Sequence, residues 1–134
     1  MIDSFGFTRR KLLSWGAVIA LLPGAAGVAA GAMRDWAPDD LAAHMRDLLR
    51  EIFGDRAAAK ALGEAYLRRY PIPPDPADVM RDLFEDHFPR DASALARLVS
   101  ERRVRDFGEG RTIVLDGWIL ARSEAQLCAL TVLL

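Results

Sequence analysis

The residues whose types could bind a metal ion lie close together near the middle of the chain. Four carboxylates and a histidine fall within one short segment, namely Asp82, Glu85, Asp86, His87 and Asp91. Oxygen and nitrogen ligands of this kind hold zinc in many proteins. On a helix, however, Asp82 and Asp86 share one face, whereas His87 lies nearer the apolar side formed by Phe84 and Phe88. His87 is therefore interpreted as a residue at the edge of a core.

Three other features could indicate a site, and each has a simpler interpretation. His44 stands alone in a helical segment, without a second ligand at the spacing of a metal site. Cys128, the single cysteine, has neither a CxxCH context for covalent haem nor a nearby base, so it is interpreted as a buried small apolar residue. Gly108 and Gly110 lack the rest of a phosphate-loop pattern and are expected to end a helix. The sequence thus predicts no catalytic, cofactor-binding or metal-binding residue in this chain.

The N-terminal segment has the form of a twin-arginine export signal. Arg9 and Arg10 follow a hydroxyl residue, and Leu12 and Leu13 come after one further position. An uncharged run rich in Ala, Gly and Leu follows, and it ends in small residues that suit a signal peptidase. Residues 1–32 are therefore predicted to be the signal. The twin-arginine translocase would deliver the protein, already folded, to the periplasm.

The same uncharged run is long enough to span a bilayer, so a retained anchor is the alternative to a cleaved signal. Pro23 and Gly24 in its middle, together with its many small residues, favour cleavage. A retained signal would attach the protein to the outer face of the inner membrane.

Residues 33–134 remain as a single small domain. About 100 residues can build one modest core, which is too little for a flavin or dinucleotide domain. The whole chain has 18 Lys and Arg residues against 19 Asp and Glu residues, and three of the basic residues belong to the signal. This balance provides no basic surface for nucleic acid, so no nucleic-acid partner is expected.

Hydrophobic periodicity and stop residues predict four helices before residue 110. The first is expected to begin at Pro38-Asp39-Asp40 and to stop at Gly54, and the second to run from Arg56 to Tyr70. The third is expected to begin at Asp75-Pro76 and to stop at Pro89, and the fourth to begin at Asp91 and to stop at Gly108. Carboxylates at or just before each start, with Asp55 before the second helix, are expected to cap them. The third has the most apolar stripe and is expected to be the core helix. The charge run 101–106 in the fourth is interpreted as a solvated face with internal ion pairs, with an anionic docking site as the alternative.

After the fourth helix, the period of the sequence changes to that of β-strands. Residues 112–115 and 118–120 flank Asp116-Gly117, the strongest short signal for a two-residue hairpin turn. A last helix is expected from Ser123, whose side chain would form a capping box with Gln126. The predicted fold is mostly α, a small bundle of four to five short helices with one β-hairpin before the C-terminal helix. Its core is expected to contain Leu48, Ile52, Leu83, Phe84, Leu98 and Leu127.

The hairpin is apolar on both faces, whereas strands with one face in water alternate apolar and polar residues. One explanation is that helices sandwich the hairpin. The other is that its second face or its edge contacts another protein. No charged residue follows Glu124, so the C-terminal helix raises the same question. The predicted partner interface comprises Ile113, Leu115, Trp118, Leu120 and Leu130.

Three segments carry a resemblance to a known family: the twin-arginine signal, the LGEAYL segment at 62–67 that leads to Pro71, and GRTIVLDGWILARSEAQLCAL at 110–130. Together they resemble the small subunit of membrane-bound sorbitol and fructose dehydrogenase complexes. The resemblance implies a non-catalytic protein that escorts a large flavoprotein dehydrogenase subunit without a signal of its own. It also implies assembly with a cytochrome c subunit. FAD would then belong to the large partner, with no cofactor in this chain.

The residues alone also lead us to expect that this chain escorts another protein. An export route for folded cargo is attached here to a domain without haem or metal ligands, which makes most sense if the cargo includes something else. Two alternatives stay open. One is a stand-alone periplasmic enzyme or binding protein, which would need a convergent polar pocket. The other is an assembly factor that keeps its signal as an anchor.

Overall fold

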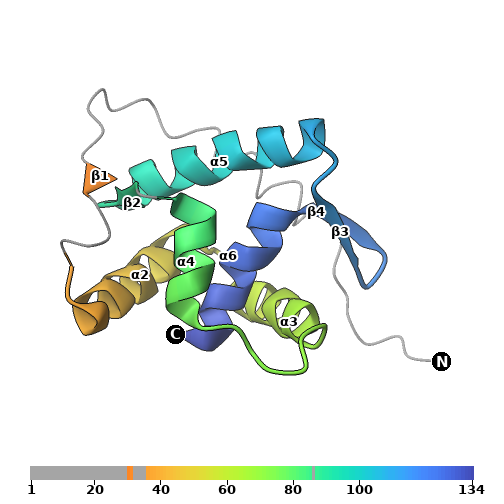
Figure 1. Cartoon of the computed structure of the whole chain (residues 1–134), viewed down its shortest axis with the longest axis horizontal. Coiled ribbons are helices and arrows are strands. Elements are labelled where there is room, and N and C mark those ends of the chain that lie inside the picture. The colour runs from red at the N-terminus through yellow and green to blue at the C-terminus, as the bar shows by residue number, and fades with distance from the viewer. Residues whose placement is uncertain (1–29, 32–35, 86) are drawn as a thin grey trace.

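The computed structural model of the protein describes residues 30–31, 36–85 and 87–134. Within these ranges the chain forms five helices and two antiparallel strand pairs (Figure 1). The helices are α2 (Pro38–Ile52), α3 (Arg56–Leu67), α4 (Pro76–Phe84), α5 (Ala92–Gly108) and α6 (Arg122–Leu133). The strands are β1 (Ala30–Gly31), β2 (Phe88–Pro89), β3 (Thr112–Leu115) and β4 (Trp118–Ala121). The expected fold, a mostly helical bundle with one hairpin before the C-terminal helix, is confirmed.

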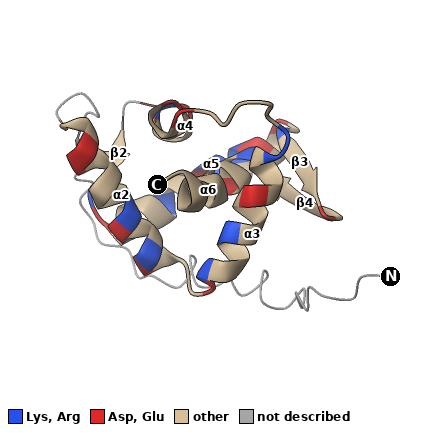
Figure 2. Cartoon of the chain, turned by 90° about the horizontal axis from the view of Figure 1, so that it is seen from below, with Lys and Arg blue, Asp and Glu red and all other residues tan. Residues whose placement is uncertain are grey.

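The central element is α6, with α3, α4 and α5 packed around it (Figures 1 and 2). Its residues from Ala125 to Leu130 are all buried, so it is enclosed on most sides. The expectation that the third helix is the core helix is therefore wrong, although α4 does bury its apolar stripe. Small residues of α6, such as Ala125 and Ala129, let the neighbouring helices approach closely.

The expected core residues are confirmed. Leu48, Leu83, Phe84 and Leu127 are buried, and Ile52 and Leu98 are partly buried against the same cluster. None of the helices in the described ranges combines the length and apolar character that crossing a membrane requires.

Local capping chemistry sets most helix starts. The carboxylates of Asp55, Asp75 and Asp91 accept hydrogen bonds from the backbone amides of Ala58, Ala77 and Ala94, at 3.0, 2.7 and 2.7 Å. At α2, by contrast, Ala37 is the cap residue and makes no side-chain bond, while Asp39 and Asp40 lie in the first turn. Their carboxylates favour the positive end of the helix dipole without capping it.

Three helix boundaries differ from expectation. α3 ends at Leu67, three residues early, and α4 ends at Phe84 because Glu85 adopts a positive φ of 55°. Helix α6 begins at Arg122, and the Glu124 carboxylate accepts a bond from the Ala121 amide at 2.9 Å. The capping box expected at Ser123 is therefore wrong.

A short strand pair joins residues near the predicted end of the signal to the folded domain. Ala30 pairs with Pro89, and Gly31 pairs with Phe88. The arginines and leucines of the predicted export motif, Arg9, Arg10, Leu12 and Leu13, lie outside the described residues.

The hairpin formed by β3 and β4 has the turn that the sequence predicts. Asp116 and Gly117 both have positive φ, 50° and 82°, which is the backbone of a type I′ turn. The register pairs Leu115 with Trp118, Val114 with Ile119, and so on outward. Each of these cross-strand pairs lies on one face of the hairpin.

Candidate functional site

The two faces of the hairpin have different surroundings. Leu115 and Leu120 are buried, and Ile113 and Trp118 are partly buried against the core. The hairpin packs near α6, α5 and α3. The inner face thus belongs to the hydrophobic core of the chain.

The outer face of the hairpin is apolar and exposed. Val114 and Ile119 lie directly opposite each other on the two strands, and their exposed fractions are 57% and 63%. No described element covers this pair. The explanation that helices sandwich the hairpin is therefore wrong for the residues that the structure describes.

Two further exposed apolar side chains lie on the part of α5 that leads into the hairpin. Val104 and Phe107 are 68% and 48% exposed, and their spacing of three residues places them on one helix face. The end of α5 and the hairpin lie at the same end of the molecule (Figure 1). Val104, Phe107, Val114 and Ile119 are called the hairpin patch below.

The structure changes the predicted interface. Leu115, Leu120 and Leu130 are buried core residues, so a partner cannot contact them while the domain is folded. Ile113 and Trp118 also face inward. The prediction was right that apolar residues occur on both faces, but it chose residues from the inner one. Strand alternation separates the two sets, and Val114 and Ile119 are the set that remains outside.

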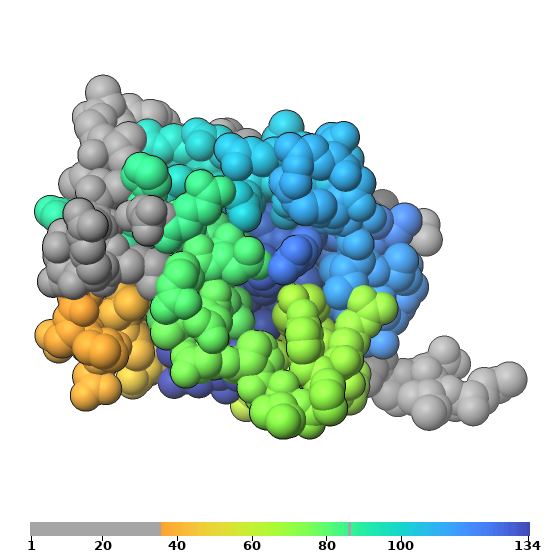
Figure 3. Space-filling view, viewed as in Figure 1, coloured from red at the N-terminus to blue at the C-terminus, as the bar shows by residue number. Residues whose placement is uncertain are grey.

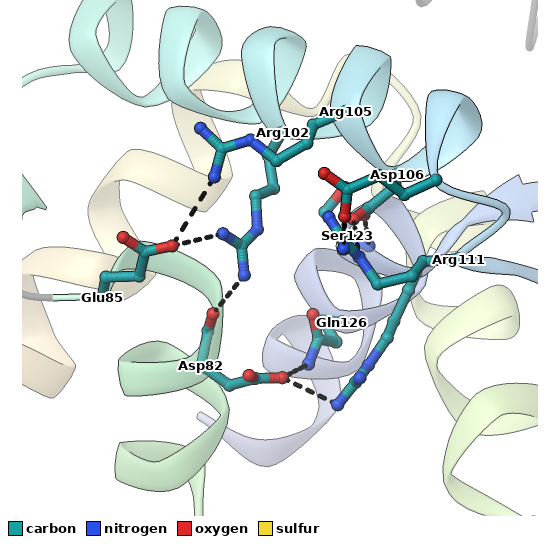
Figure 4. Close-up of polar contacts among 10 residues, drawn as sticks. Asp82, Glu85, Arg102, Arg105, Asp106, Arg111, Ser123 and Gln126 are labelled. Atoms are coloured by element: carbon teal, nitrogen blue, oxygen red, sulfur yellow. Dashed lines mark hydrogen bonds and ion pairs between the residues drawn. The ribbon is translucent and has the colours of Figure 1, made fainter.

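A buried carboxylate fixes the start of α6, and hence the base of the hairpin. Asp106 of α5 is only 2% exposed. Its two oxygens accept bonds from the backbone amide of Ser123 and from Nε of Arg111, both at 2.9 Å (Figure 4). Burial raises the pKa of this carboxyl, but the bonds from Ser123 and Arg111 outweigh burial, and the pKa is lowered overall.

Further polar contacts join α4 to α5 and α6. The Asp82 carboxylate accepts bonds from Gln126 at 2.5 Å and from Arg122 at 2.9 Å, while Arg102 binds Glu85 at 2.5 Å and the Asp82 carbonyl at 2.9 Å (Figure 4). These groups line a polar hollow of about 390 Å³, visible as a recess where α6 lies behind α4 and α5 (Figure 3). The carboxylates and arginines of the hollow are paired with one another, which favours a structural role in orienting three helices.

The charge run in the fourth helix is therefore only partly a solvated face. Arg102 and Arg105 both contact Glu85 across to α4, and Asp106 is buried. The ion pairs of the charge run 101–106 therefore join α5 to other elements rather than residues within the helix.

Comparisons of this chain with protein-family models, with curated proteins and with solved structures found no match.

The residues considered for metal or nucleophilic chemistry lie apart. His87 is exposed after the end of α4. His44 stacks on Trp36 with ring centroids 4.9 Å apart, and its Nε2 is 3.3 Å from the Pro89 carbonyl oxygen. Among the described residues, no group of three His, Cys, Asp or Glu residues is arranged to hold a metal ion.

Cys128 is fully buried in α6, as the sequence predicts. Burial raises the pKa of its thiol to about 12, so the thiol stays protonated at neutral pH. A protonated, enclosed thiol is a poor nucleophile, and the residue acts as a small apolar group in the core.

Replacing Asp106 by Asn is expected to lower the free energy of unfolding by about 1–3 kcal/mol at neutral pH, because one buried acceptor becomes an amide that opposes the donors around it. Because the pKa of Asp106 is lowered in the folded protein, the direction in which its contribution to the unfolding free energy changes with pH is also fixed. The stabilisation is complete above the ordinary carboxyl pKa of about 4 and is lost as pH falls through the lower folded-state pKa.

The difference in unfolding free energy between the wild type and Asp106→Asn should therefore shrink as the solution is made acidic. Denaturant unfolding at several pH values measures it. Asp116→Asn is the matched control, because Asp116 is exposed in a turn that accepts Asn. A difference that is constant from neutral to acidic pH would contradict the role given to Asp106.

Proposed function

We propose that this chain is the non-catalytic small subunit of a larger complex, which it escorts through twin-arginine export to the periplasm. The hairpin patch is the observation that carries the proposal, because exposed apolar side chains gather at one end of a small domain. The partner proposed from the resemblance is a large flavin-dependent sugar or polyol dehydrogenase subunit, with a cytochrome c subunit completing the assembly. FAD would be bound by the large subunit.

The physical argument rests on the Val114–Ile119 pair. β-branched side chains facing each other across two strands form a flat, stiff apolar surface with little rotamer entropy to lose on binding. An isolated two-stranded sheet also leaves an outer edge on each strand, where a partner could add backbone hydrogen bonds. Such a surface suits a permanent interface, whose buried centre is apolar.

Isolation of the tagged chain from the periplasm of its own cells tests the proposal. We expect a larger protein to be recovered in fixed ratio, and the complex to carry a flavin absorption spectrum. Recovery of the chain as a monomer by light scattering would contradict an escort role. Recovery with a partner that lacks flavin would indicate an assembly factor of another kind.

The export step has its own test. The double change Arg9→Lys with Arg10→Lys keeps the charge of the segment but removes the paired guanidinium groups, so we expect the protein to stay in the cytoplasm. Fractionation followed by immunoblotting measures this. Lys11→Arg, which leaves the arginine pair intact, is the control and should be exported. Periplasmic recovery of the double variant would remove the basis for the twin-arginine prediction.

A further inference from the structure

A second feature lies where the start of α3 meets α2 and the end of α6. A hollow of about 310 Å³ is lined there by ten residues, among them Arg46 and Arg50 of α2 and Arg56 and Lys60 of α3. Four of them are cationic and come from two helices, whose basic residues are seen as blue bands on α2 and α3 (Figure 2). This hollow is called the basic groove below.

The cations of the basic groove are largely without acidic partners. Arg50 pairs with Asp47 at 3.0 Å. For Arg46, Arg56 and Lys60, the described part of the chain places no carboxylate within ion-pair distance. The carboxylate of Asp55, which caps α3, accepts a hydrogen bond from the Ala58 amide. The arginines of the polar hollow, in contrast, are all paired with carboxylates.

The helix dipole of α6 does not account for this concentration of charge. A helix C-terminus carries the equivalent of about half a negative charge, whereas three cationic side chains without a carboxylate partner in the described residues, Arg46, Arg56 and Lys60, line the hollow beside this one. The chain as a whole has a net charge of −1, so the groove is a local excess of positive charge on a protein that is otherwise slightly acidic.

The floor of the groove is apolar. Leu49, Phe53 and Leu130 are buried beneath it, and Leu134 is partly buried at its side. A basic rim above an apolar floor matches a ligand with an anionic head and an apolar body. Guanidinium groups bind phosphate oxygens in pairs, and an ammonium group adds a point charge.

We propose that the basic groove binds the phosphate headgroup of an anionic phospholipid. The arginines and Lys60 contact the phosphodiester, and the first carbons of the lipid lie on the apolar floor. Basic pockets between transmembrane helices recognise lipid headgroups through the same chemistry. The groove lies on elements other than the hairpin patch, so this inference does not depend on the identity of any protein partner.

The test uses the purified full chain and a soluble short-chain phosphatidylglycerol below its micelle concentration, so that the apolar N-terminal segment has no bilayer to enter. Binding is measured by calorimetry. We expect short-chain phosphatidylglycerol to bind at least tenfold more tightly than short-chain phosphatidylcholine, with an affinity that falls as salt is raised.

The groove variant Arg46→Gln, Arg56→Gln, Lys60→Gln should bind the anionic lipid at least tenfold more weakly. Arg68→Gln, Arg69→Gln, Arg90→Gln is the control, because it removes the same charge at exposed positions that do not line the groove. Melting temperatures verify that both variants are folded, and single substitutions replace the triple variant if it is not.

Three results would overturn the proposal. They are equal binding of the two lipids, equal weakening by the groove and control variants, and absence of binding to the anionic lipid. A fourth arm uses inorganic phosphate. Binding of phosphate as tight as that of phosphatidylglycerol would overturn the lipid assignment, because the apolar floor would then contribute nothing.

Discussion

Replacing Gly63 by Ala is expected to lower the free energy of unfolding by about 3 kcal/mol, at the upper end of the range for overpacked cores. A Cβ atom added at Gly63 would clash with the carbonyl oxygen of Cys128 and would lie 2.7 Å from its carbonyl carbon and 3.0 Å from the Ala129 amide nitrogen. These are backbone atoms of α6, and a helix backbone cannot rotate aside as a side chain can. The two helices would have to separate.

Thermal unfolding followed by circular dichroism measures the effect. For a domain of about 100 residues, each kcal/mol lowers the melting temperature by about 4–8 °C, so a fall of more than 10 °C is expected. Gly108→Ala is the matched control. A Cβ at Gly108 has no atom within 4 Å, and alanine is the better helix former. An unchanged melting temperature for Gly63→Ala would show that α3 and α6 do not pack backbone to backbone.

The same contact links the centre of the fold to the hairpin. Helix α6 follows β4 directly, and Asp106 holds its first turn through the Ser123 amide. A displacement of α6 would therefore move the base of the hairpin as well. Gly63→Ala should therefore weaken partner binding as well as lower the stability of the domain.

Features that depend on neighbouring residues could be predicted from the sequence. Asp55, Asp75 and Asp91 cap helices because the acceptor and the amide are two or three residues apart. The Asp116-Gly117 turn is equally local, since two adjacent residues supply its positive φ values. The order of helices and the position of the hairpin follow from these signals.

Features that depend on residues far apart in the chain could not be predicted from the sequence. Ser123 looks like a cap in the sequence, but its amide is bound by Asp106, seventeen residues earlier, and the helix starts before it. The sequence alone indicates that Asp106 belongs to a solvated charge run. In the fold, α6 and Arg111 lie beside it and its carboxylate is buried. The central position of α6 likewise depends on its small residues, which allow distant helices to pack closely against it.

The candidate interface was predictable as a segment but not as a face. Residues 113–115 and 118–120, on either side of the Asp116-Gly117 turn, are all apolar, and strand alternation divides them into two sets. Which set packs inward depends on where the helices lie, and no local pattern contains that information. The structure places Leu115 and Trp118 inside and leaves Val114 and Ile119 outside.

The central claim is that a larger protein binds the outer face of the hairpin, and the double variant Val114→Thr with Ile119→Thr tests it. Threonine keeps the β-branched shape that strands favour, so the change is mainly one of polarity. Because both side chains are exposed, we expect the unfolding free energy to change by no more than about 0.5 kcal/mol for each substitution. If the pair lies at the centre of an interface, the loss of binding should be about 2 kcal/mol or more, which is roughly thirtyfold in the dissociation constant.

The most direct measurement is quantitative recovery of the partner from periplasmic extract by the tagged wild type, the double variant and Ile72→Thr. Ile72 is 79% exposed in the loop between α3 and α4, so its replacement makes the same kind of change away from the hairpin. The account predicts full recovery by the wild type and by Ile72→Thr, and recovery reduced at least tenfold by the double variant at an unchanged melting temperature. Full recovery of the partner by the folded double variant would contradict it.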